Sequence, residues 1–401
     1  MSLEDLIRAP KLGAALGVVG GGQLGRMLGL AARPLGHPLH VLAPFSDAGA
    51  PARSVAARWV EGAFADLDAH RTLAAEVAAI TFEVEDAEPD VLAVLEGEGV
   101  AVHPSPAALR IVRRRASQRR WLREHGFPMP ALRVVESVEA LAAAEAELTS
   151  EAGPPFVKTD RGGFDGRGQA RGRASEDPAM RAALEEQPLV VEAAVPFDRE
   201  LSVLVARDAA GNVAVHPVAE NVHIQAVLHH AMLPARVDEG TAAEARALAA
   251  RLATTIGLVG ILVVELFVTA EGLLVNEMAL RPHNTFHGAD RACALGQFEQ
   301  QLRAVLGWPL GDPELQRPTA LVNLFGDLWA GGGGAGLDLA AALAVPTVQV
   351  HLYEKAATRP RRKMGHLTAT GATVDEALAR ALDAERRLRA SAGVPAFGVS
   401  A

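Results

Sequence analysis

The chain has 401 residues, of which 49% are hydrophobic and 22% are charged, and its formal net charge is −9 at pH 7. This composition is typical of a globular protein with two or three domains, and the negative charge argues against a general nucleic-acid binder. No apolar run is long enough to cross a membrane and no secretory signal opens the sequence. The single cysteine, Cys293, excludes an intramolecular disulfide. We therefore expect a cytoplasmic protein.

A glycine-rich turn follows the first predicted strand. Residues 16–19 lead into Gly20-Gly21-Gly22-Gln23-Leu24-Gly25 and then into a helix. The glycines have the GxGxxG spacing of dinucleotide-binding loops, but the second strand, residues 40–42, ends without the acidic residue that would hold a ribose. This counts against NAD. An anion at the helix N-terminus and a tight turn formed for packing alone both stay open.

Strands and helices alternate through the first hundred residues, which indicates a doubly wound parallel sheet. Val77–Phe82 is predicted as a buried strand that ends at Glu83, and residues 100–102 as another strand. Ligands bind beyond the carboxyl ends of such strands. Glu83 and the glycine turn are therefore expected to share a ligand, unless Glu83 is simply a surface carboxylate.

The basic segment 109–125 is predicted to be one helix with a solvated face. Of its arginines, Arg115 is retained as a candidate ligand-binding residue. The next unit opens with the strand Phe156–Thr159, which carries Lys158, one of only four lysines. That strand runs into a loop with four glycines in residues 162–168, whose backbone can wrap phosphates. A flexible hairpin tip is the alternative.

A further strand, residues 189–195, carries Glu192 and continues into a short linker that can lie along a planar ring. Glu200 follows, then a hairpin around residues 211–212 and the segment that carries His223. A helix is predicted over residues 241–256, with a glycine as its stop signal. These elements lead to the most distinctive part of the sequence.

Two apolar runs within residues 261–280 predict a β-hairpin, and each run carries one carboxylate. The predicted register sets Glu265 opposite Glu277 and Thr269 opposite Leu273, with Gly272 in the left-handed position of a three-residue loop. Like charges opposed on a sheet are destabilising unless a cation lies between them. Asn276 and Glu277 offer the hard oxygen ligands that suit Mg²⁺ held jointly with substrate phosphates. A solvated hairpin face is the alternative.

Arg281, His283 and Asn284 follow the hairpin and supply a guanidinium fork and two polar groups, which suit an oxyanion. Strands are predicted over residues 320–325 and 348–353, and an amphipathic helix over residues 374–390. Residues 361–366 are predicted to be a basic turn, either an anion seat or a solvated turn. A strand lysine with a phosphate loop, a carboxylate pair and an oxyanion site together describe ATP-dependent activation of an acid, and no Walker A motif is present.

Four stretches together resemble the N5-carboxyaminoimidazole ribonucleotide synthases, ATP-grasp enzymes of purine biosynthesis. They are residues 20–27, 158–169, 276–284 and 362–366, and they occur in the order found in that family. The resemblance implies an α/β fold with a Rossmann-like domain over residues 1–117, an ATP-grasp domain over 118–307 with its lid at about 120–195, and a small β-rich C-terminal domain over 308–401 that completes the substrate site. It also implies a homodimer that converts 5-aminoimidazole ribonucleotide, ATP and bicarbonate into the N5-carboxyamino product, ADP and phosphate through carboxyphosphate.

The resemblance extends to individual site residues. ATP would be held by Arg115, Lys158, Gly163, Phe164, Asp165, Gly166, Arg167, Gly168, Gln169, Glu192, Ala193, Ala194, Val195, Glu200, His223, Asn276 and Glu277. Glu265 and Glu277 would hold Mg²⁺, while Arg281, His283 and Asn284 would bind bicarbonate and carboxyphosphate. The aminoimidazole ribonucleotide would lie against Gln23, Leu24, Glu83, Asp165, Lys355 and Arg362, with Asp165 touching the reacting amine.

Four positions depart from the family pattern: Phe164 replaces a tyrosine, Asp160 a basic residue, Phe286 a glycine and Ala43 an aspartate. If the family glycine adopts a positive φ, which is costly for phenylalanine, the loop at Phe286 must follow a different path. Three other functions stay open. They are a sister ATP-grasp ligase, such as formate-dependent glycinamide ribonucleotide transformylase or biotin carboxylase, an NAD-dependent dehydrogenase, and a non-catalytic nucleotide-binding regulator.

Overall fold

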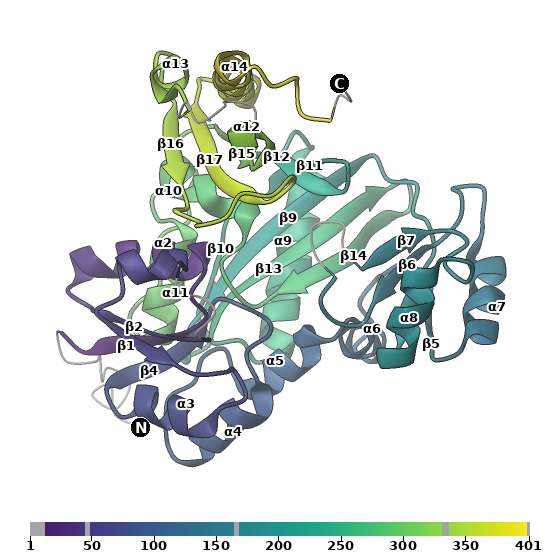
Figure 1. Ribbon diagram of the computed structural model, residues 1–401, viewed down its shortest axis with the longest axis horizontal. Helices are drawn as coiled ribbons and strands as arrows, with labels where there is room; N and C mark the ends of the chain where they lie inside the picture. Colours follow the sequence, from purple (N-terminus) through teal and green to yellow (C-terminus); the bar gives the residue numbers. More distant parts are fainter. Residues whose placement is uncertain (1–12, 45–48, 164–167, 331–336, 399–401) are drawn as a thin grey trace.

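The first sheet in the structure is parallel, with the strand order β3-β2-β1-β4, as the alternating pattern predicts. The computed structural model describes residues 13–44, 49–163, 168–330 and 337–398 (Figure 1). The elements of this part are β1 (Ala15–Val19), α2 (Gln23–Ala32), η1 (Arg33–Leu35), β2 (Leu39–Ala43), η3 (Pro51–Ser54), β3 (Arg58–Glu61), α3 (Leu67–Ala74), β4 (Val77–Phe82) and α4 (Pro89–Gly97). Residues 100–102 add only one bridge, between Ile80 and Val102, rather than a further strand.

The basic segment predicted as one helix is two helices, so that prediction is wrong. They are α5 (Pro106–Arg113) and α6 (Arg115–Glu124). Arg114 between them is extended, with φ −113° and ψ 128°. Asp160 explains the break, because its carboxylate accepts a hydrogen bond of 2.8 Å from the N–H of Ala116 and pairs with Arg114 at 3.1 Å. The face is not wholly solvated either, since Arg119 is only 1% exposed.

A small antiparallel sheet with the strand order β5-β8-β6-β7 stands apart at the right of Figure 1, and we call it the lid sheet. Its elements are β5 (Leu132–Val135), α7 (Val138–Leu148), β6 (Phe156–Thr159), β7 (Gln169–Arg171), α8 (Pro178–Glu186) and β8 (Leu189–Glu192). It has a core of its own, in which Leu141, Val157 and Leu189 are buried together. Among the described residues, its strands pair with no strand of another sheet.

The central sheet has nine antiparallel strands in the order β14-β13-β9-β11-β12-β15-β17-β16, with β10 paired to β9. The strands are β9 (Arg199–Arg207), β10 (Val213–Val215), β11 (Ala219–Ile224), β12 (Val227–Leu233), β13 (Gly260–Thr269), β14 (Gly272–Ala279), β15 (Thr319–Phe325), β16 (Gln349–Leu352) and β17 (Lys363–Thr370). The C-terminal strands continue this sheet because β15 pairs with β12. Since β17 begins at Lys363, most of the predicted basic turn is strand, and only residues 361–362 precede it.

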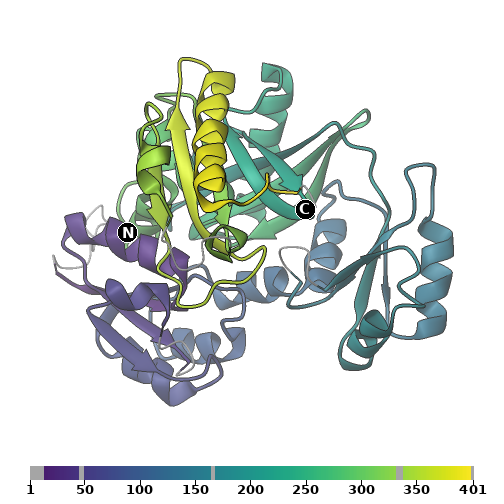
Figure 2. The same ribbon diagram turned by 45° about the horizontal axis from the view of Figure 1, so that its top comes forward.

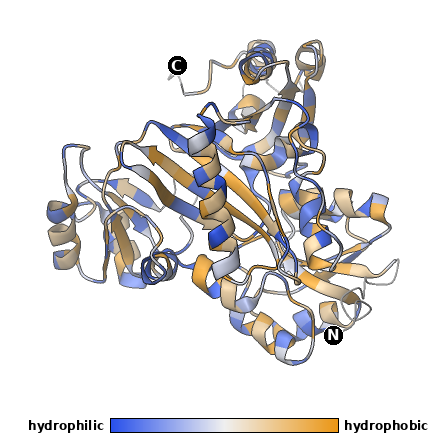
Figure 3. Cartoon of the chain, turned by 180° about the vertical axis from the view of Figure 1, so that it is seen from behind, coloured by the Kyte–Doolittle hydropathy of each residue, from blue (hydrophilic) through white to orange (hydrophobic). Residues whose placement is uncertain are grey.

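Helices cover both ends of the central sheet. They are α9 (Glu239–Thr255), α10 (Ala289–Ala292), α11 (Gln297–Val305), α12 (Asp327–Ala330), α13 (Leu339–Leu343) and α14 (Val374–Ala392), with a 3-10 turn η4 (Asn284–Gly288). From behind, α9 lies across the back of the sheet, whose strands are mainly hydrophobic (Figure 3). Helix α14 covers β15 and β17 (Figure 2), and α11 packs on both β13 and α2 and so joins the central sheet to the first. In the part of the chain that the structure describes, no helix could span a membrane.

Candidate active site

The hairpin of β13 and β14 sets Glu265 directly opposite Glu277, as predicted. The predicted register is wrong only between Glu265 and the turn, where Thr269 pairs with Gly272 rather than with Leu273. The turn is shorter than expected by one residue, and Gly272, with φ +121°, already belongs to β14. A bulge between Glu265 and Leu266 shifts the pairing by one residue, and this shift brings Glu277 opposite Glu265 despite the shorter turn.

The bulge makes Asn276 the extra residue beside the carboxylate pair, since Glu265 pairs with Glu277 and the next residue, Leu266, pairs with Val275. The Nδ2 of Asn276 donates a hydrogen bond of 3.5 Å to Oε2 of Glu265. The pKa of Glu265 is raised to about 7 by burial and by the charge of Glu277. A cation between the two carboxylates would offset both effects, so the pair fits a divalent metal.

No group of three or more histidine, cysteine or acidic side chains among the described residues could hold a metal ion. Among the described residues, a cation at Glu265 and Glu277 would therefore take further ligands from asparagine or main-chain oxygens, and otherwise from water or substrate oxygens. That ligand set suits Mg²⁺, which keeps several ligands from water and from substrate phosphates.

His223 and Glu200 lie beside this pair on neighbouring strands, β11 and β9. The Nδ1 of His223 hydrogen-bonds to Oε2 of Glu200. Burial alone lowers the pKa of His223, but the hydrogen bond to Glu200 and the charge of Glu265 leave it raised. The structure thus brings two predicted nucleotide ligands together near the predicted metal site.

Arg281 and His283 follow β14 and have different charge states. Nε of Arg281 lies 2.6 Å from Oε1 of Glu85, a residue that follows β4 in the first sheet. Nε2 of His283 lies 3.6 Å from Oε1 of Glu265, and its main-chain N–H donates to Gln297 at 2.8 Å. Burial, followed by the charge of Arg281, holds the pKa of His283 well below its usual range, so this imidazole is neutral.

Asn284 is buried and forms a reciprocal amide pair with Asn323 of β15, with bonds of 3.0 and 2.6 Å. Its amide therefore holds the turn to the C-terminal strands, and it also hydrogen-bonds to the side chain of Tyr353. Phe286 takes a backbone conformation that is ordinary for a non-glycine residue. Its φ is −97° and it is 1% exposed, packed beside Ala289 and Cys293.

The glycine turn wraps a carboxylate of the protein itself. Glu83 is 5% exposed, and its oxygens accept hydrogen bonds from the N–H groups of Gly22 at 2.6 Å and Gly25 at 3.1 Å. A Cβ on Gly20 would lie 2.6 Å from Glu83, so the approach requires glycine. Because Glu83 occupies the N-terminus of α2, where a pyrophosphate would lie, the dehydrogenase reading loses its support.

Burial raises the pKa of Glu83 to about 7 in spite of these two hydrogen bonds. The charges of Arg281 and Lys355 act in the opposite direction, so both cations lie within electrostatic range of Glu83. Gln23 and Leu24 begin α2 at the same turn, and Leu24 is buried. The structure therefore brings these four predicted substrate residues to one region.

Lys355 and Arg362 lie in the segment between β16 and β17, while the predicted substrate residue Asp165 lies outside the described residues. Nζ of Lys355 donates to the main-chain oxygen of Lys363 at 2.7 Å, and Arg362 donates to the oxygen of Ala357 at 2.6 Å. The adjacent Glu354 pairs at 2.6 Å with Arg26 of α2. This ion pair ties the C-terminal segment to the helix that follows the glycine turn.

Lys158 and Glu192 meet on adjacent strands of the lid sheet, where Nζ of Lys158 donates to Oε2 of Glu192 at 2.5 Å. Nε of Arg119 donates to Oε1 of the same carboxylate at 2.7 Å. Burial alone raises the pKa of Glu192, but Arg119 and Lys158 leave it well below its usual range. Desolvation lowers the pKa of Lys158, and Glu192 opposes that shift.

The phosphate loop lies only partly within the described residues: Phe164, Asp165, Gly166 and Arg167 fall outside them. Nη2 of Arg115 donates to the oxygen of Gly163 at 3.3 Å. Gly168 has φ +60° and Gln169 pairs with Lys158, so the loop connects β6 to β7. The segment after Glu192 holds the predicted ligands Ala193, Ala194 and Val195, where the N–H of Ala193 donates to Ala131 at 2.9 Å.

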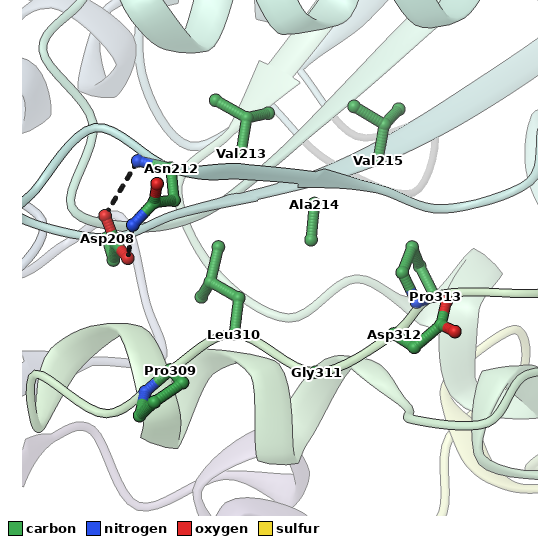
Figure 4. Close-up of a pocket in the computed structure, with 10 residues that line it drawn as sticks. All are labelled: Asp208, Asn212, Val213, Ala214, Val215, Pro309, Leu310, Gly311, Asp312 and Pro313. Atoms are coloured by element: carbon green, nitrogen blue, oxygen red, sulfur yellow. Dashed lines mark hydrogen bonds between the residues drawn. The ribbon is translucent and has the colours of Figure 1, made fainter.

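Three partners of the site were missed by the sequence reasoning, namely Arg119, Glu85 and Asn323. Arg119 stands four residues after Arg115, one helical turn away, and this spacing could have placed both on one face. Glu85 and Asn323 carry no such signal, because each meets its partner only through the tertiary fold. A surface groove of about 560 Å³ between β10 and residues 309–313 contains none of the predicted site residues (Figure 4).

Comparison with known proteins gives the class first. Residues 120–298 match the ATP-grasp domain, residues 14–113 the ribonucleotide synthetase preATP-grasp domain, and residues 319–380 the phosphoribosylaminoimidazole carboxylase C-terminal domain. The fold and the carboxylate-bearing hairpin thus define an ATP-grasp enzyme. The chain belongs to the N5-carboxyaminoimidazole ribonucleotide synthase family.

Three similar proteins support that assignment. The enzyme of that name from Brucella melitensis is 40% identical over 363 residues, which cover 89% of this chain and 96% of the relative. The ADP complex of an N5-carboxyaminoimidazole ribonucleotide synthetase superposes with a TM-score of 0.86 at 35% identity, covering 94% of this chain and 98% of the other. The Aspergillus clavatus synthase, solved with ADP and 5-aminoimidazole ribonucleotide, superposes with a TM-score of 0.83 at 30% identity, covering 94% and 99%.

Proposed function

We propose that this chain carboxylates 5-aminoimidazole ribonucleotide at N5, using ATP and bicarbonate and releasing ADP and phosphate, in purine biosynthesis. The observation that carries the proposal is the opposition of Glu265 and Glu277, with Arg281 and His283 directly downstream. This arrangement supports a metal-binding carboxylate pair next to a cationic oxyanion site. The Aspergillus clavatus relative, solved with ADP and the aminoimidazole ribonucleotide, supports the choice of substrates.

The proposed reaction has two steps. An oxygen of bicarbonate attacks the γ-phosphorus of ATP, ADP leaves, and carboxyphosphate forms. The substrate amine then attacks the carboxyl carbon, the C–O bond to phosphate breaks, and the amine loses a proton. Because phosphoryl transfer depends mainly on positioning and on stabilising charge, the protein has to align two anions and hold them away from water.

Glu265 and Glu277 would hold Mg²⁺, with Asn276 beside them. When bound, this metal neutralises charge on the transferred phosphoryl group. Arg281 would donate to bicarbonate and to carboxyphosphate, while its pairing with Glu85 keeps the guanidinium oriented. Neutral His283 can donate or accept a hydrogen bond without adding charge, and Asn284 would complete this set.

ATP would lie between the lid sheet and the central sheet. Lys158 and Arg115 would face its phosphates, together with the loop that ends in Gly168 and Gln169. Glu192 and the segment 193–195 would face the base, while Glu200 and His223 would face the ribose. Burial lowers the pKa of Lys158, and Glu192 opposes this shift and so favours the charged form of the lysine that would meet the phosphates.

The aminoimidazole ribonucleotide would bind between the glycine turn and the C-terminal segment. Gln23, Leu24 and Glu83 would contact one side of it, and Lys355 and Arg362 would take its phosphate. Asp165 is proposed as the group that touches the amine. We also propose a homodimer that acts in the cytoplasm, with domains over residues 1–117, 118–307 and 308–401.

A coupled assay tests the function. Purified protein should release phosphate from ATP only when Mg²⁺ and 5-aminoimidazole ribonucleotide are both present, and it should consume one bicarbonate for each ATP. Phosphate release that does not need the ribonucleotide would contradict the proposal. Activity with formate and glycinamide ribonucleotide would instead support the sister ligase.

A further inference from the structure

Arg119 is a buried cation that contacts two separate sheets. Its Nε donates to Glu192 of the lid sheet at 2.7 Å, and its Nη1 donates to the main-chain oxygen of Val275 in β14 at 3.2 Å. Its Nη2 donates to the main-chain oxygen of Asn276, the bulged residue next to Glu277. The side chain is only 1% exposed, and its hydrogen bonds to Glu192 and Val275 are buried.

The acceptors of Arg119 stand at the two ends of the proposed ATP site. Glu192 is the proposed contact of the base, and Asn276 immediately precedes the metal-binding carboxylate of Glu277. We propose that Arg119 is a positioning residue that makes nucleotide binding and metal binding interdependent. This inference rests on the proposed function, because it assigns Glu192 and Glu277 the roles given there.

The chemistry of arginine suits this task. A guanidinium presents its donors in a rigid planar fork, so fixing one acceptor restricts where the other acceptors can lie. The carbonyls of Val275 and Asn276 flank the bulge that sets Glu277 opposite Glu265. A shift of Glu192 therefore moves the same fork that holds the bulge. A lysine has the charge but lacks the fork.

The charges around Glu192 also support this role of Arg119. The single carboxylate of Glu192 is shared by two cations, Arg119 and Lys158. Removing Arg119 would leave Glu192 paired with Lys158 alone and would leave two buried carbonyls without a donor. Both the nucleotide end and the metal end of the site would then change at once, which is the physical basis of the interdependence.

The test compares R119K and R119Q with R120Q, which alters an exposed arginine on the same helix. ADP binding is measured by calorimetry in EDTA and in excess MgCl₂. The coupling is the ratio of the two dissociation constants, and by linkage it also measures the effect of ADP on Mg²⁺ binding. We expect R119K and R119Q to weaken binding of ADP with Mg²⁺ by about tenfold or more, and to lower the ratio by about fivefold or more. R120Q should match the wild type.

Two results would overturn the inference. If R119K weakens ADP binding but leaves the ratio unchanged, Arg119 serves only the nucleotide end. If both ADP affinity and the ratio are unchanged while kcat falls, Arg119 serves packing alone. R119K keeps the buried charge, so it remains informative if R119Q does not fold. The binding test needs no ribonucleotide, so a wild-type chain that binds ADP with Mg²⁺ but fails to carboxylate the ribonucleotide contradicts the proposed function without touching the inference.

Discussion

Arg281 and Glu85 form an ion pair of 2.6 Å between the segment after β14 and the segment after β4. The cation proposed to meet the oxyanion is thus oriented by a carboxylate of the first sheet. E85Q should lower kcat by about tenfold, the loss expected for one charged hydrogen bond, and leave the KM for ATP unchanged. E88Q is the control, because Glu88 pairs with Arg113 at 2.6 Å in the same segment. Steady-state kinetics that show equal losses in both variants would contradict the orienting role.

The carboxylate pair predicts the effect of E277Q. ATP turnover should fall by at least about a hundredfold, since one metal-binding charge is lost, while the fold persists because the repulsion of Glu265 is relieved. E271Q alters an exposed glutamate in the same hairpin and should keep wild-type activity. Circular dichroism confirms folding, and near-normal turnover by E277Q would refute the metal assignment.

The raised pKa of Glu265 predicts how stability depends on pH. Its folded value of about 7 exceeds the ordinary value of 4.5, so its contribution is fully present below about pH 4.5 and is lost as the pH rises through 7. Without Mg²⁺ the loss is on the order of 3 kcal/mol, at roughly 1.4 kcal/mol per pKa unit. Mg²⁺ should therefore raise Tm more at about pH 8 than at about pH 5.5. In E265Q, the dependence of Tm on pH and the dependence of the Mg²⁺ effect on pH should both be smaller than in wild type. A Tm that rises with pH in wild type but not in E265Q would contradict the prediction.

The close approach of Gly22 to Glu83 predicts a local steric effect. A Cβ at residue 22 would lie 2.8 Å from Oε1 of Glu83, so G22A should destabilise the protein by about 1–3 kcal/mol and lower its activity. Gly97 is exposed at the end of α4 and has no atom within 4 Å of a Cβ position. G97A should be neutral or slightly stabilising. Urea denaturation measures both changes, and equal behaviour of the two variants would contradict the packing argument.

The capping of α6 by Asp160 separates stability from positioning. D160A should cost about 1–2 kcal/mol, as a lost N-cap does, and should raise the KM for ATP because α6 carries Arg115 and Arg119. D177A is the control. Asp177 caps α8, which belongs to the lid sheet, and its carboxylate accepts a hydrogen bond of 2.8 Å from the N–H of Ala179. D177A should cost a similar free energy and leave the KM for ATP unchanged. A KM that rises equally in both variants would show that loss of stability alone is responsible.

Features with a regular period could be predicted from the sequence. The alternating pattern of β13 and β14 placed Glu265 opposite Glu277, and the alternation of strands and helices gave the first sheet. The register near Thr269 could not be predicted, because a bulge adds a residue without changing which residues are apolar. The family resemblance, rather than any periodic pattern, supplied the assignments of individual residues.

Features that depend on residues far apart in the chain could not be predicted from the sequence. The break between α5 and α6 is set by Asp160, whose carboxylate accepts a hydrogen bond from the N–H of Ala116, 44 residues earlier in the chain. The burial of Arg119 depends on Glu192, 73 residues away, so a basic run on a helix looked solvated. The position of Glu83 beside the glycine turn was expected from the parallel sheet, but the two hydrogen bonds that Glu83 accepts from this turn were not.

The continuity of the central sheet limits how the protein can move. From β14 at one edge to β16 at the other, every strand is hydrogen-bonded to its neighbour, so the proposed metal pair and the proposed phosphate seat share one stiff frame. The lid sheet pairs with no strand of that frame among the described residues. Arg119 links the two, because it donates to Glu192 of the lid sheet and to main-chain oxygens of β14, so any movement of the lid sheet against the frame has to strain or break these hydrogen bonds.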